Sequence, residues 1–244
     1  MLPLCAVTVD VESDWGGRAS AEDRGVEGCR YGIPRVLDIF DRFGVRSTFF
    51  VSSEVSGVIG PELRAITSRG HEIASHGWRH LRYDHLPLER LDEQLRASKN
   101  TLEDVTGLTV SGFRSPQFAP HRELFPALAR AGYQYDSSLV AGRIPGRYHN
   151  KIDHRPFWKD GVLEIPVGSL PLTPVPSGLL WLNLVRTAIP LEWLTSPDQH
   201  LSVFYLHPFD LYPARYTTRF NWTINLWYLL RQKHGAGVAG SRQE

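Results

Sequence analysis

Short apolar segments alternate with amphipathic segments along most of the chain. Residues 4–11 form an apolar run with the length of one buried strand. In residues 33–43 the apolar positions recur at helical spacing, which predicts a helix, and Pro34 fits its first turn because a missing N–H is tolerated there. The clearest helix is predicted over residues 88–106, and Gly107 follows it as a C-terminal cap.

The alternation continues to about residue 206. The pattern predicts further strands over residues 46–51, 72–75, 110–113, 133–136, 162–167 and 201–206, and further helices over residues 61–69 and 122–131. This repeated order of strand and helix indicates a parallel α/β fold, and we expect a barrel. Residues 142–160 form a long polar connection, which is typical of a substrate-facing loop.

Length and composition limit the classes of protein. The chain has 244 residues, 42% of them hydrophobic, which favours one domain over residues 1–234 and a flexible polar tail over residues 235–244. A net charge of +1 gives no electrostatic basis for binding nucleic acid, and no apolar run is long enough for a transmembrane helix. Cys5 and Cys29 are too few for a disulfide framework, and no signal-peptide pattern is visible, so we expect a cytoplasmic location.

Candidate metal ligands stand in two places. His76 and His80 are four residues apart, a spacing that lets two imidazoles reach one metal ion. Asp10 and Glu12 are two residues apart at the end of the first predicted strand, so both point to the same side. Two histidines, one carboxylate and an open position make a catalytic zinc-type site, and the second carboxylate beside it would serve as a base.

Three more polar residues follow predicted strands, namely Arg114, Asp136 and His207. In an α/β barrel the functional groups gather at the C-terminal ends of the strands, so we expect these side chains to lie near the candidate ligands. Each residue alone has an ordinary structural explanation, since Arg114 could be an ion-pair partner and His207 a buried histidine. Their joint occurrence in this order favours a functional site.

With these motifs in this order, the sequence resembles the polysaccharide deacetylase (NodB-homology) family, carbohydrate esterase family 4. The resemblance extends from about Val7 to Asp210. Its pieces are Thr-Val-Asp10-Val-Glu12, Ser-Thr48-Phe-Phe-Val, Gly-His71-Glu-Ile-Ala-Ser-His76-Gly-Trp-Arg-His80, Phe-Arg114-Ser-Pro116, Tyr-Asp136-Ser-Ser and Tyr-Leu-His207-Pro. The histidine block and the ordered series are specific, whereas each short piece alone is not.

The resemblance implies a distorted (β/α) barrel of about seven parallel strands that binds one divalent metal ion, with zinc as the first choice. Asp10 corresponds to the family's catalytic base, and His76 and His80 correspond to its histidine ligands. Arg114 corresponds to the arginine that orients the base, and His207 to the histidine that acts as general acid. The implied reaction is metal-dependent hydrolysis of an N-acyl group, N-acetyl first of all, on an amino sugar in a glycan or glycan precursor.

Two departures from the family pattern leave residue roles open. Many members carry adjacent aspartates at the first motif, whereas here a valine separates Asp10 from Glu12, so we expect Glu12 as the carboxylate ligand and Asp14 as the alternative. The fourth motif often contains a later Asp-Trp pair, which a Ser-Leu pair replaces here. The aspartate that would tune His207 is therefore open, and Asp136 is a candidate for this catalytic role or for a structural one.

The substrate is less constrained than the chemistry. Trp15 and Trp78 flank the expected ligands and are candidates for stacking on a sugar ring, although core or rim aromatics would look the same. The strongly apolar residues 177–194 favour a buried helix, yet they leave a lipid-linked amino sugar and peripheral membrane contact open. The alternatives are a deformylase or deacetylase of such a lipid-linked sugar, an amidohydrolase of a small cyclic amide, and a carbohydrate-binding barrel without activity.

Overall fold

One curled sheet of eight strands forms the centre of the described part of the molecule. The structure is a computed structural model that describes residues 4–13, 24–141, 143–144, 148–149, 152, 154–169, 176–179, 181–182 and 201–212. The strands of the sheet are β1 (Leu4–Val11), β2 (Thr48–Val51), β3 (Glu72–Ser75), β4 (Gly112–Phe113), β5 (Tyr135–Asp136), β8 (Phe157–Lys159), β9 (Val162–Glu164) and β10 (Leu201–Leu206). A separate two-stranded ribbon consists of β6 (Arg143–Ile144) and β7 (Tyr148–His149).

The order of strands in the sheet is β10-β1-β2-β3-β4-β5-β9-β8. Every neighbouring pair is parallel except β8 and β9, which leaves seven strands running in one direction. Two short contacts connect the chain beyond β9 to β10. The N–H of Gly168 bonds to the carbonyl of Val203 at 3.3 Å, and Gly178 forms a bridge with Tyr205. The distorted barrel with about seven parallel strands, predicted from the sequence, is therefore confirmed.

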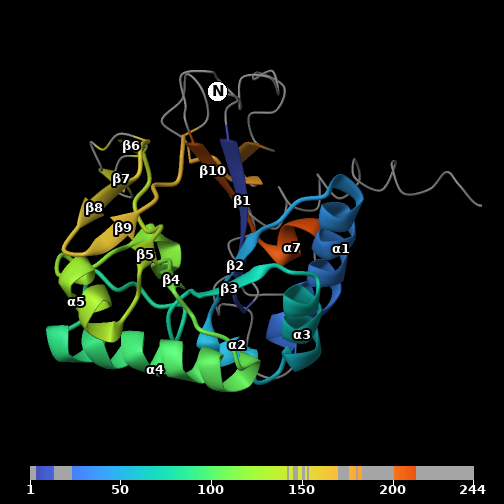
Figure 1. Cartoon of the computed structure of the whole chain (residues 1–244), viewed down its shortest axis with the longest axis horizontal. Coiled ribbons are helices and arrows are strands. Elements are labelled where there is room, and N and C mark those ends of the chain that lie inside the picture. The colour runs from blue at the N-terminus through green and yellow to red at the C-terminus, as the bar shows by residue number, and fades with distance from the viewer. Residues whose placement is uncertain are drawn as a thin grey trace, which may run out of the picture.

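Helices pack around the outside of the curled sheet (Figure 1). They are α1 (Glu27–Phe43), α2 (Ser53–Ser56), α3 (Gly60–Ser68), α4 (Leu88–Thr106), α5 (Leu124–Ala131) and α7 (Pro208–Leu211), with short 3-10 helices η1 (Arg24–Val26) and η2 (Pro116–Phe118). Figure 1 shows α1 and α3 side by side, α4 along a second side and α5 next to α4. None of the described helices is both long enough and apolar enough to cross a membrane.

The sequence pattern predicts the helices unequally well. The helix expected over residues 88–106 is confirmed with the same bounds, and Gly107 caps it in the left-handed conformation with a φ of 69°. The placement of Pro34 in a first turn is wrong, because α1 begins at Glu27 and Pro34 lies inside it. The buried face of α1 continues backwards through Cys29, so core packing extends the helix before the residue at which the apolar spacing becomes obvious.

Strand β1 separates an apolar environment from a polar one. Val9 and Val11 are fully buried in the main hydrophobic core, together with side chains of α1 such as Ile33. Thr8 and Asp10 alternate with these valines, so they face the opposite side of the sheet. Because β1 is covered on both sides, Asp10 is buried as well, and its carboxylate needs a partner inside the protein.

A second buried carboxyl pair lies across β5 and β9. The register of these strands places Asp136 directly opposite Glu164, and both side chains are fully buried. Asp136 accepts a hydrogen bond of 2.5 Å from Ser138 Oγ, and Glu164 accepts one of 3.0 Å from the N–H of Leu139. Burial raises the pKa of both carboxyl groups, and the charge of Asp136 raises the pKa of Glu164 further. The pair therefore takes up a proton at a higher pH than exposed carboxyl groups do.

Replacing this proton-holding carboxyl group with an amide should make stability less sensitive to pH. A raised pKa in the folded state means that the folded protein binds more protons than the unfolded chain, so its free energy of unfolding falls as the pH rises above the ordinary pKa of Glu164. The loss approaches about 1.4 kcal/mol per pH unit for one proton. Glu164→Gln should remove most of this loss, since glutamine is uncharged and still offers an oxygen to Leu139.

Urea unfolding at about pH 5 and about pH 8 measures the effect. Glu89→Gln is the control, because Glu89 is exposed on α4. This variant should show the same pH dependence of the free energy of unfolding as wild type. If wild type and Glu164→Gln lose the same free energy of unfolding between the two pH values, the pKa of Glu164 is not raised in the folded protein.

Candidate functional site

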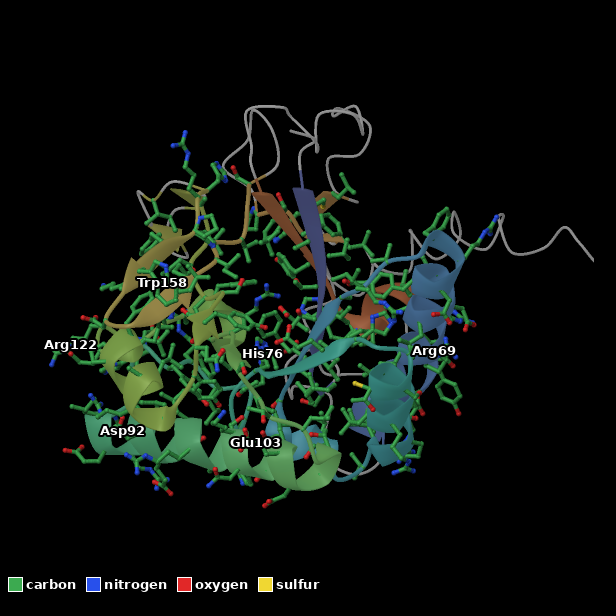
Figure 2. The ribbon with its side chains drawn as sticks, in the orientation of Figure 1. Arg69, His76, Asp92, Glu103, Arg122 and Trp158 are labelled. Carbon is green, nitrogen blue, oxygen red and sulfur yellow. The ribbon has the colours of Figure 1, made fainter. Side chains whose placement is uncertain are left out.

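The three candidate metal-ligand side chains meet where β1 and β3 end. Glu12 follows β1, whereas His76 and His80 follow β3, with β2 between these strands. One ligand atom from each residue lies within 4.8 Å of the other two. Glu12 Oε2 is 3.6 Å from His76 Nε2 and in close contact with His80 Nε2. In Figure 2, His76 lies in the interior, whereas the labelled Asp92 and Arg122 lie at the margin of the molecule.

The hydrogen bonds around these residues leave acceptor atoms facing one another. His76 Nδ1 lies 2.9 Å from the backbone carbonyl oxygen of Arg114, which can only accept, so Nδ1 carries the proton and Nε2 of the neutral ring presents a lone pair to Glu12. Glu12 Oε2 and His80 Nδ1 are buried and have no hydrogen-bond partner among the described residues. A cation between the three side chains would satisfy the facing acceptors, so this donor set fits a divalent metal ion.

The charges around Glu12 favour its ionised form. Burial alone would raise the pKa of this carboxyl group. Positive charge on the rings of His80 and His207, together with the contacts of the His76 and His80 rings, lowers the pKa well below its usual range, and a cation in place of the ring protons would act in the same direction. Glu12 is therefore a carboxylate at neutral pH, which is the form that binds a metal ion.

Two further side chains hold the backbone of these ligands in place. Cys29 Sγ, which is buried in α1, donates to the carbonyl of Glu12 at 3.2 Å. Glu54 in α2 accepts the backbone N–H of His80 at 3.2 Å. Sequence analysis missed both roles, because each contact joins segments that are far apart in the chain and neither residue type points to this function.

Asp10 and Arg114 form a buried ion pair beside the ligands. Arg114 Nη1 donates to Asp10 Oδ1 at 2.6 Å and to Thr8 Oγ1 at 2.9 Å. On its other side the guanidinium donates to Ser137, through Nε to the carbonyl oxygen at 3.1 Å and through Nη2 to Oγ at 2.9 Å. The ring of Phe50 lies under it, with the ring centroid 4.0 Å from the guanidinium carbon. Asp10 and Arg114 are in contact, as the sequence predicts, and the hydrogen bond from the arginine fixes the direction of the carboxylate.

His207 reaches the same place from β10, at the other end of the described chain. Its Nε2 lies 3.8 Å from Glu12 Oε1, and its Nδ1 lies 3.4 Å from Asp210 Oδ2. Burial lowers the pKa of His207, but the hydrogen bond and charge of Asp210 and the charges of Glu12 and Asp10 outweigh it and raise the pKa to about 9. The protonated ring can donate a proton at neutral pH.

The remaining candidates from the sequence lie in different situations. Asp136 bonds to Ser138 and lies opposite Glu164, whereas the carboxylate that bonds to His207 is Asp210. Trp78 is half-buried in the loop that carries the histidine ligands. Trp15 and Asp14 lie outside the described residues, as does most of the apolar segment 177–194. Sequence analysis missed Asp210, although its place three residues after His207 is the spacing of a helix capping box.

Comparison with known proteins finds similarity to the family that the motifs resemble. The family model described as Polysaccharide deacetylase matches residues 23–135. A peptidoglycan deacetylase of Helicobacter pylori is 26% identical over 146 residues, which are 57% of this chain and 50% of that protein. The chain therefore spans about half the length of this curated relative.

Solved structures extend the likeness of the fold over most of the chain. A crystal structure from Mycobacterium smegmatis, assigned as a polysaccharide deacetylase, has a TM-score of 0.65 and 24% identity, covering 86% of this chain and 78% of that one. The structure of Puue allantoinase has a TM-score of 0.62 and 18% identity, covering 97% and 85%. This chain is thus similar to polysaccharide deacetylases over residues 23–135, and it shares the fold of the Mycobacterium smegmatis structure over most of its length.

Proposed function

We propose that the protein is a metal-dependent hydrolase that removes an N-acetyl group from an amino sugar of a glycan or glycan precursor. The observation that carries this proposal is the meeting of the ligand set Glu12, His76 and His80 with Asp10 and His207 at one edge of the sheet. Zinc is the proposed metal, because two imidazole nitrogens and one carboxylate oxygen are typical donors of catalytic zinc sites. The sugar substrate is proposed from the relative that deacetylates peptidoglycan.

The chain's own residues supply a base and an acid. A divalent metal held by Glu12, His76 and His80 would lower the pKa of a bound water and polarise a carbonyl oxygen. Asp10, which Arg114 orients, accepts a proton from the water that attacks the carbonyl carbon. His207 donates a proton to the nitrogen of the leaving amine as the C–N bond breaks. The products are acetate and a free amino sugar, so atoms and charges balance.

Two finer features of the function are supported by the sequence alone. A lipid-linked amino sugar is an alternative substrate, suggested by the apolar residues 177–194. A cytoplasmic location is proposed from the two cysteines, which are too few for the disulfide framework of a secreted protein. Assays should therefore include a soluble N-acetylglucosamine oligomer, peptidoglycan fragments and a lipid-linked amino sugar.

Removing one histidine ligand should abolish tight metal binding. Wild type is expected to bind one zinc ion per chain, and His80→Ala should weaken zinc binding by at least about 100-fold, because two donors hold a metal far less well than three. His85→Ala is the matched control, since His85 lies five positions further on and its side chain is 79% exposed. Competition with a chromophoric chelator measures the affinities, and equal affinity of His80→Ala and wild type would remove this residue from the site.

Neutralising the base should slow catalysis without removing the metal. Asp10→Asn keeps the shape of the side chain but cannot accept a proton, so kcat for acetate release should fall by at least about 100-fold. Zinc stoichiometry should stay at one per chain, because Asp10 is bonded to Arg114 and is outside the ligand set.

Asp38→Asn is the control, since Asp38 is an exposed residue of α1 whose side chain is 74% exposed. Asp10→Asn protein that binds zinc and keeps wild-type kcat would exclude Asp10 as the base. Activity on a small cyclic amide, with no release of acetate from any of the sugars, would instead favour the amidohydrolase alternative.

A further inference from the structure

The carboxylate of Asp210 holds His207 at two points. Asp210 lies in α7, directly after β10, and only 4% of its side chain is exposed. Its Oδ2 accepts the backbone N–H of His207 at 2.8 Å and lies 3.4 Å from Nδ1 of the same residue. One oxygen atom therefore caps the start of α7 and also faces the imidazole. A helix cap alone would require only the first of these contacts.

Aromatic rings fix the remaining faces of the imidazole. The ring of Phe209 is stacked on His207, with centroids 4.6 Å apart and an angle of 11° between the planes. The ring of Tyr205 meets it edge to face at 5.8 Å. With Nδ1 directed at Asp210, Nε2 is directed at Glu12 Oε1, 3.8 Å away. This orientation presents Nε2 to the site where the scissile bond would lie.

Helix α7, which carries Asp210, is itself anchored on α1. A Cβ on Gly32 would lie 2.1 Å from the carbonyl oxygen of Pro208, so the two helices meet at a position where only glycine fits. Arg35 Nη1 donates to the carbonyl of Leu211 at 3.0 Å, which ties the other end of α7 to the same helix. The backbone that carries Asp210 is therefore held at both ends.

We propose that Asp210 is the positioning residue of the proposed general acid, His207. It bonds to Nδ1 and thereby keeps Nε2 directed toward the leaving nitrogen of the substrate. Asp136, the candidate for this role in the sequence, bonds elsewhere, to Ser138, and lies opposite Glu164. The inference rests on the proposed deacetylase function, but the orientation of His207 can be measured without turnover.

Asp210→Asn removes the negative charge of the carboxylate but keeps an oxygen at the position of both contacts. The amide oxygen of asparagine can still accept the backbone N–H of His207, so the cap and the fold should be kept, while the charged partner of Nδ1 is lost. With the full-length, zinc-reconstituted protein and an N-acetylglucosamine oligomer, kcat should fall by at least about 10-fold and KM should change by less than about 2-fold. Asp104→Asn, at an exposed position of α4, should change neither constant.

A second readout does not depend on activity. In protein labelled with ¹⁵N-histidine, the Nδ1–H proton of His207 should appear at low field in wild type, since a carboxylate accepts its hydrogen bond, and should move upfield in Asp210→Asn. In Asp210→Ala this proton should exchange with water too quickly to be seen. A purely structural cap would leave this resonance unchanged.

The two readouts distinguish failure of the inference from failure of the function. Unchanged kcat and an unchanged Nδ1–H resonance in Asp210→Asn would overturn the role of Asp210. If wild type releases no acetate from the oligomer, the deacetylase proposal fails for that substrate, and the resonance in the three proteins alone decides whether Asp210 orients His207.

Discussion

The buried guanidinium of Arg114 is the group on which the site depends. A fully buried charge is tolerated only when it is paired and its donors are satisfied, and here Asp10, Thr8 and Ser137 meet that requirement from β1 and from the end of β5. The backbone carbonyl of Arg114 also bonds to Nδ1 of His76. One residue therefore fixes the proposed base, sets the protonated nitrogen of a candidate metal ligand and ties three strands together.

The parallel sheet brings the rest of the chemistry to the same edge. Val9 of β1 pairs with Leu206 of β10, so the residues that follow these positions, Glu12 and His207, emerge close together although they are almost two hundred positions apart. The candidate metal ligands follow β1 and β3, whereas the proposed acid follows β10 and is anchored through α7 on α1. The elements that hold the candidate metal ligands therefore differ from those that hold the proposed acid. Substitutions in α7 should reduce proton transfer more strongly than they weaken metal binding.

The sequence predicts those features that depend on local pattern. Strand 4–11, helix 88–106 and the spacing of His76 and His80 follow from alternation, helical period and motif, and the structure has them in these positions. The early start of α1 could not be predicted, because it depends on packing of residues such as Cys29 against β1 rather than on their own apolar spacing.

Contacts between residues far apart in the chain could not be predicted from the sequence, for a related reason. The pairing of Asp136 with Glu164 is set by the register of β5 and β9, which no local pattern specifies. Asp210 is different, since its position after His207 is a local signal that capping rules describe. A search for capping spacing around each candidate histidine would have found it.

Anomalous X-ray diffraction from a crystal soaked in zinc tests the central claim most directly. The account predicts one strong peak in the zinc anomalous map, within bonding distance of Glu12, His76 and His80, at about 2.0–2.2 Å from a donor atom of each. A peak bound elsewhere, or no peak at these three side chains in well-ordered density, would contradict the account and leave the meeting of Glu12, His76 and His80 without its proposed purpose.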